Sequence, residues 1–81
     1  NKACAIDPHD TVVIEELSEL IKAVSKINRC HNNKHLKSLM EEIADVRIVI
    51  ERIMRKYNIK EDDIDKLVVF KINLFIDRYG I

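Results

Sequence analysis

Apolar residues recur at helical spacing from Leu36 to Tyr57, and this periodicity constrains the fold more than any other feature of the chain. Glu42 lies in the middle of the apolar face that a helix turning by about 100° per residue would present. An ionised carboxylate on a packed apolar face is costly unless a cation, a strong hydrogen-bond donor or a metal ion balances it. The segment therefore predicts an amphipathic helix whose inward carboxylate needs a positive partner. The apolar residues of this face are Leu39, Ile43, Val46, Val49, Ile50 and Ile53.

A first helix is predicted from the residues after Pro8 to about Arg29. We expect Asp10 or Thr11 to cap it, because either side chain can accept a hydrogen bond from a free amide at a helix N-terminus. Its main apolar stripe is Val13, Leu17, Leu20, Val24 and Ile27.

Two acidic pairs, each spaced three residues apart, fall on these two predicted helices. Glu16 and Glu19 form the first pair, and Glu42 and Asp45 form the second. Residues three apart on a helix project from neighbouring positions, so each pair places two carboxylates on one side. On the helical wheel Glu16 flanks the apolar stripe and Glu19 lies slightly further out, whereas Glu15 points more fully away. Two such helices side by side would enclose a hard divalent ion.

The segment 30–35, rich in Asn and His, predicts a short loop between antiparallel helices. We expect the second helix to continue to about Tyr57, with Asn58 as its stop signal. The acidic group 61–63 suits the positive N-terminal end of a third helix, which is expected to run to about Tyr79. Its apolar stripe is Ile64, Leu67, Val68, Phe75 and Tyr79.

Several apolar residues fall outside all three stripes and still need to be covered. A three-helix chain alone would leave much of this apolar surface in water, so the pattern predicts a helical bundle completed by self-association, as a dimer or tetramer. These residues are Met40, Ala44, Ile48, Val69, Phe70 and Ile76.

The composition is that of a single small domain covering residues 1–81, with a core that is marginal on its own. Hydrophobic residues make up 47% of the chain, which contains one Gly and one Pro, so an all-α fold is expected and no linker divides it. Because the chain does not begin with Met, we expect the N-terminal segment to be incomplete.

The charge balance and apolar runs limit the classes of partner. The 14 basic and 14 acidic residues cancel, so net charge draws the chain toward neither nucleic acid nor an anionic membrane. No membrane span or secretory signal is recognised, so the expected location is cytoplasmic. Cys4 and Cys30 are expected to be reduced thiols. Cys30, His31 and His35 lack a paired-Cys zinc motif and are interpreted as polar loop residues.

Magnesium is the metal that the carboxylate pairs favour, with manganese as a substitute. Mg²⁺ prefers oxygen ligands and often completes its coordination with substrate phosphates. A di-iron bundle would need Glu-x-x-His pairs, and a calcium site of the EF-hand type would need a flexible loop; neither involves these carboxylates. The predicted ligands are Glu16, Glu19, Glu42 and Asp45.

The spacing of these acidic residues resembles the EExxE, spacer, ExxD signature of MazG-like nucleotide pyrophosphohydrolases. Residues Glu15 to Glu19 read E-E-L-S-E, and after the spacer 20–41 the residues Glu42 to Asp45 read E-I-A-D. Both halves at this separation on helices are fairly specific. The resemblance extends over the phrases EELSELIKAVSK, EEIADV and NIKEDDI.

The resemblance implies an all-α enzyme that cleaves nucleoside triphosphates between the α and β phosphates, releasing a nucleoside monophosphate and pyrophosphate. It implies metal-binding and catalytic roles for Glu16, Glu19, Glu42 and Asp45, and Glu15 matches the first motif position. Relatives often have a fuller helix before the first motif, which helps to form the base pocket. The base and the sugar preferred are therefore not indicated.

Lys71 and Arg78 are candidate phosphate contacts, because they project near the apolar stripe of the third helix and carry the charge that a triphosphate needs. The alternative is that their methylenes lie on the core and their charged ends reach solvent. Lys22 and Lys26 are expected to be solvated, and Asn73 points away from this side of the helix.

A second interpretation belongs to another functional class. The chain would be a catalytically silent helical module for oligomerisation or regulation that keeps the same fold. In that case divalent metal would not bind the acidic positions, and removing the Glu42 charge would leave stability unchanged or improve it by relieving repulsion.

Overall fold

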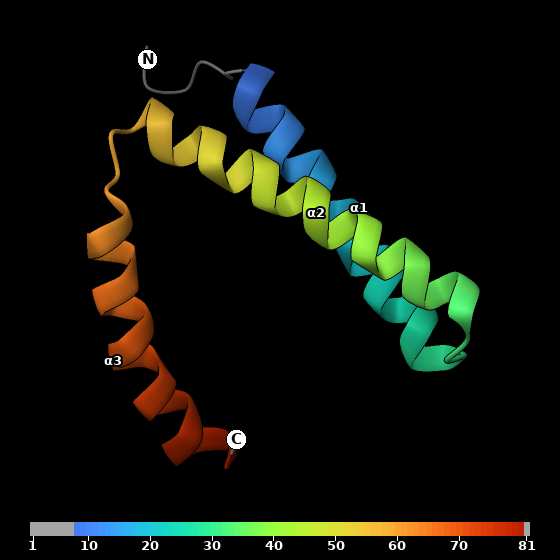
Figure 1. Ribbon diagram of the computed structural model, residues 1–81. Coiled ribbons are helices and arrows are strands. Elements are labelled where there is room, and N and C mark those ends of the chain that lie inside the picture. Colours follow the sequence, from blue (N-terminus) through green and yellow to red (C-terminus); the bar gives the residue numbers. More distant parts are fainter. Residues whose placement is uncertain (1–7, 81) are drawn as a thin grey trace, which may run out of the picture.

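The protein is all-α, as the sequence predicts, and the computed structural model describes residues 8–80. Its helices are α1 (Pro8–Arg29), α2 (Asn33–Lys56) and α3 (Glu61–Tyr79). Helices α1 and α2 lie side by side as an antiparallel hairpin, and α3 extends away from one end of it (Figure 1). No helix within the described range is long and apolar enough to cross a membrane.

The first helix begins at Pro8, so the prediction that Asp10 or Thr11 caps it is wrong. Proline suits a first turn because its missing N–H costs no helical hydrogen bond there. Asp10 instead joins the start of α1 to the end of α2. Its carboxylate accepts a hydrogen bond from Lys56 Nζ at 3.1 Å and one from the Tyr57 hydroxyl at 3.1 Å.

The connection between α1 and α2 is shorter than predicted, because α2 already begins at Asn33. Asn32 caps α2: its side-chain oxygen accepts a hydrogen bond from the His35 backbone N–H at 2.7 Å. His35 Nδ1 lies 2.7 Å from the Cys30 carbonyl oxygen. Cys30 is an exposed free thiol, and Cys4 lies outside the described residues. Cys30 and His31 lie in this connection, as interpreted from the sequence, whereas His35 lies in the first turn of α2, so its interpretation as a loop residue is wrong.

The core of the hairpin is thin. Its buried apolar side chains within residues 10–80 are Ala23, Val46 and Val49. Each predicted stripe is only partly covered, since one edge faces the other helix and the other edge faces solvent. The half-buried members are Val13, Leu20, Ile27, Leu39 and Ile53, and the exposed members are Leu17, Val24, Ile43 and Ile50.

Helix α2 stops at a left-handed residue, which redirects the chain. Asn58 has φ 52°, a conformation that Asn tolerates better than most residues, so its predicted role as a stop signal is confirmed. The Ile59 N–H donates to the Met54 carbonyl at 2.8 Å and the Asn58 N–H to that of Arg55 at 3.3 Å, the bonding of a Schellman motif. Helix α3 therefore starts in a new direction.

Helix α3 packs against neither α1 nor α2 in the described part of the chain (Figure 1). Its predicted apolar stripe is consequently exposed, apart from the half-buried Ile64. Val69 is 64% exposed and Phe70 62%, so these apolar residues outside the stripe are also uncovered in a single chain. The three predicted helices are confirmed, but a single chain does not close them into one bundle because α3 has no surface of its own chain to pack on.

Val46→Ala should lower the free energy of unfolding by about 1 to 2 kcal/mol, since it removes buried methyl groups from this thin core. Urea denaturation followed by circular dichroism measures the change. Arg47→Ala, at the exposed neighbouring position, is the control and should stay within about 0.5 kcal/mol of the wild type. Equal effects of the two substitutions would show that α2 does not bury Val46.

Candidate metal centre

Three carboxylates meet across the α1–α2 hairpin. Glu16 of α1 and Glu42 and Asp45 of α2 each offer one oxygen, and these three oxygens lie within 4.8 Å of one another. Glu42 and Asp45 share one side of α2 because they are three residues apart, and the antiparallel pairing brings Glu16 opposite them. We call these three residues the carboxylate cluster. Glu16 and Glu42 are half-buried, and Asp45 is exposed.

Glu42 occupies the inward position that its sequence context predicts. Its Oε2 atom is buried and has no hydrogen-bond partner among the described residues. A buried acceptor without a donor costs about 1 to 3 kcal/mol, and more when it is charged. The side chain that most needs a cation therefore lies where two further carboxylates converge.

The surroundings of Glu16 raise its pKa above the usual 4.5. Partial burial is the largest cause, followed by the negative charges of Asp45 and Glu42. A side-chain hydrogen bond with Asp45 and the charge of Glu19 raise the pKa further. All of these effects disfavour the ionised form, so the cluster holds more negative charge than its surroundings balance.

Glu19, the fourth predicted ligand, lies beside the carboxylate cluster and is not one of the three residues that converge. It is exposed, and its Oε1 is 3.4 Å from Lys22 Nζ, one turn along α1. It is still close enough for its charge to raise the pKa of Glu16. Glu15 is exposed and is likewise not among the converging residues.

The predicted phosphate contacts lie apart from the carboxylate cluster in a single chain. Lys71 and Arg78 are exposed on α3, where they line a small pocket of about 170 Å³ with Leu74 and Phe75. Since α3 packs against neither helix of the hairpin, one chain does not bring these cations to the cluster. Sequence periodicity assigned them to a side of α3 but carries no information on where α3 lies.

The sequence did not predict a pocket at the open end of the hairpin, by which we mean the end opposite the connection between α1 and α2. It has a volume of about 520 Å³, and Arg52 of α2 is one of its lining residues. The sequence does contain one indication that Arg52 belongs near the site. Arg52 follows Asp45 by seven residues, a spacing that places both side chains on the same side of α2.

The donor set suits a hard divalent cation. Carboxylate oxygens are the ligands that Mg²⁺ and Mn²⁺ prefer, and a cation at this position would satisfy the buried Glu42 oxygen and neutralise the repulsion around Glu16. Acidic groups also gather at protein surfaces without binding metal, so the partner-free Glu42 oxygen is the more informative observation.

No protein-family model matches the chain, and no curated protein or solved structure matches it either. Its function must therefore be inferred from the residues of the site and their spacing.

Glu16→Gln should raise the free energy of unfolding at pH 7 in the presence of chelator. The raised pKa means that folding disfavours ionised Glu16. The free energy of unfolding of the wild type is therefore lowered above the pKa that Glu16 has in the folded protein. This loss of stability disappears as the pH falls through that pKa toward 4.5. The advantage of the variant should accordingly shrink over this interval. Denaturant titrations between pH 4 and pH 7, about the range that brackets this titration, measure it.

Glu41→Gln is the matched control, because Glu41 is exposed and adjacent to Glu42. It should show no such pH-dependent gain. A Glu16→Gln protein that is less stable than the wild type at pH 7 in chelator would contradict the repulsion inferred for the carboxylate cluster.

Proposed function

We propose that the protein is a Mg²⁺-dependent, MazG-like nucleoside triphosphate pyrophosphohydrolase of the cytoplasm, cleaving between the α and β phosphates to give a nucleoside monophosphate and pyrophosphate. The observation that carries the proposal is the convergence of Glu16 and Asp45 on the buried, partner-free oxygen of Glu42. The order and spacing of the same residues resemble the signature of that family, which supports the same reaction. Mn²⁺ is the expected substitute metal.

In this proposal Glu16, Glu42 and Asp45 hold the metal, and Glu19 joins them from the adjacent turn of α1. A bound divalent cation would neutralise and orient the triphosphate and lower the pKa of the attacking water. Placement on two paired helices keeps the carboxylates in fixed relative positions, which favours productive alignment of the substrate. A carboxylate oxygen not engaged by the cation can accept the proton of the water.

We also propose that the protein works as a homo-oligomer. The exposed apolar residues of α3 and of the open edges of the hairpin are what such an assembly would cover. Lys71 and Arg78 are proposed as phosphate contacts. Since α3 packs against neither α1 nor α2 in a single chain, these cations would reach the substrate only within that assembly.

The second candidate function is a catalytically silent module for oligomerisation or regulation. The exposed apolar surface of α3 favours it, since this surface fits a role in association whether or not the carboxylate cluster binds metal. The two candidates differ in what they expect of Glu42.

Glu42→Gln should reduce triphosphate hydrolysis at least 100-fold while the protein stays folded, since it removes one of the converging charges on which the proposed metal site depends. The assay is pyrophosphate release from a panel of common and modified nucleoside triphosphates, with Mg²⁺ and with chelator. Calorimetry with Mn²⁺ should show a matching loss of metal binding.

Glu41→Gln should retain wild-type turnover in the same assay. A folded wild type that releases no pyrophosphate from any triphosphate and binds no divalent metal would favour the silent module, as would an unchanged or improved stability of Glu42→Gln at every Mg²⁺ concentration.

Phe70→Lys should shift the protein from a dimer or tetramer toward a monomer, because it places a charge on an exposed apolar residue of α3 that the assembly is proposed to cover. Light scattering after size exclusion measures the mass. A wild type that already runs at the 9.5 kDa of one chain would refute the homo-oligomer.

A further inference from the structure

The pocket at the open end of the hairpin combines apolar walls with positive charge. Its walls are the aliphatic side chains of Val12 and Val13 from α1 and of Val49 and Ile53 from α2. The remaining lining residues are cations of α2, and no carboxylate among the described residues lines it. Its volume of about 520 Å³ is within the range of about 300 to 1,000 Å³ that is common for small-ligand sites.

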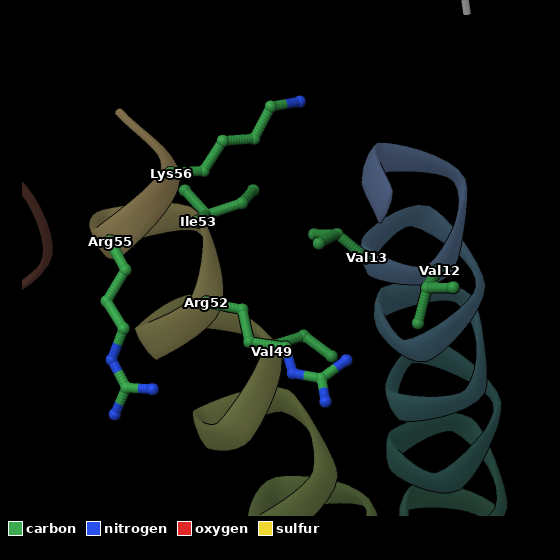
Figure 2. A pocket seen from close by; sticks show the side chains of 7 residues that line it. All are labelled: Val12, Val13, Val49, Arg52, Ile53, Arg55 and Lys56. Atoms are coloured by element: carbon green, nitrogen blue, oxygen red, sulfur yellow. The ribbon is translucent and has the colours of Figure 1, made fainter. Parts of the chain in front are cut away.

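Only one of the three lining cations is directed into the pocket without a partner. Lys56 is bound to Asp10 at 3.1 Å. Arg55 points away from α1, whereas Arg52 reaches from α2 into the space between the helices, beside Val49 (Figure 2). The described residues provide no hydrogen-bond or ion-pair partner for Arg52.

This pocket lies further along the hairpin than the carboxylate cluster, about one to two turns away on each helix. On α1, Val13 lies three residues before Glu16, which is less than one turn. On α2, Arg52 lies seven residues after Asp45, a separation of about 10 Å along the axis. Helical side chains lean toward the N-terminus of their helix, so the direction in which Arg52 leans is toward Asp45.

We propose that Arg52 binds the β and γ phosphates of the substrate, the part that leaves as pyrophosphate. This inference rests on the proposed function and assigns one end of the substrate to the pocket. A guanidinium offers paired donors that match two phosphate oxygens. The aliphatic walls lower the local dielectric constant, which strengthens that contact.

The chemistry of the walls favours the pyrophosphate end over the nucleoside end. A nucleobase presents both donors and acceptors at its edge, and the described side chains that line this pocket, aliphatic and cationic, offer it no acceptor and no aromatic surface. Pyrophosphate also carries more negative charge than the monophosphate product. The end of the triphosphate with the greater charge should therefore lie toward Arg52.

Product inhibition distinguishes the two ends of the substrate. Arg52→Ala should weaken inhibition by pyrophosphate roughly 10- to 100-fold, the loss expected for hydrogen bonds to a charged group, and should leave inhibition by the monophosphate unchanged. Arg52→Lys should fall between Arg52→Ala and the wild type, because it keeps the charge and loses the paired donors. Calorimetric titration with magnesium pyrophosphate should give the same ranking.

Arg47→Ala is the control, because Arg47 is exposed on α2 and does not line the pocket; it should behave as the wild type. The assignment is overturned if Arg52→Ala leaves pyrophosphate affinity unchanged, weakens the monophosphate instead, or changes the oligomeric mass. A wild type without pyrophosphate release would count against the proposed function itself, whereas an active wild type with an unaffected Arg52→Ala would count only against Arg52.

Discussion

The repulsion among carboxylates that face one another across the α1–α2 hairpin is the constraint on which the rest of the site depends. Glu42 is directed inward by the same periodicity that builds the apolar face of α2, so its position on the helix cannot turn to solvent without turning that face outward. Glu16 meets it from α1, and its raised pKa reflects the resulting excess of negative charge. The hairpin thus combines packing that favours its formation with charges that oppose it.

The fold follows from local sequence to a large extent. Helical periodicity, the left-handed tendency of Asn58 and the acidic start at residues 61–63 were sufficient to predict three helices with nearly the observed ends. The position of Glu42 was predictable for the same reason, because a helical wheel depends only on spacing. The N-terminal cap was not, because Asp10 makes its contacts with Lys56 and Tyr57, distant in sequence.

The parts of the candidate site that sequence reasoning could not place are those that depend on tertiary contacts. Which of the four carboxylates converge is decided by the pairing of α1 with α2. Glu19 is not brought into the cluster and contacts Lys22, its neighbour on α1. The distance of Lys71 and Arg78 from the carboxylate cluster is decided by the direction of α3, and the turn at Asn58 controls that direction. Helical periodicity predicts which residues share a side of one helix, but it does not predict how two helices are placed relative to each other.

The hairpin is fastened at both ends, with the carboxylate cluster between them. At one end Asn32 and His35 secure a short loop, and at the other Asp10 bridges to Lys56 and Tyr57. These contacts oppose the splaying of the two helices, the movement by which the carboxylates would otherwise separate. A ligand of opposite charge would therefore gain the free energy of relieving this repulsion in addition to that of its own contacts with the carboxylates.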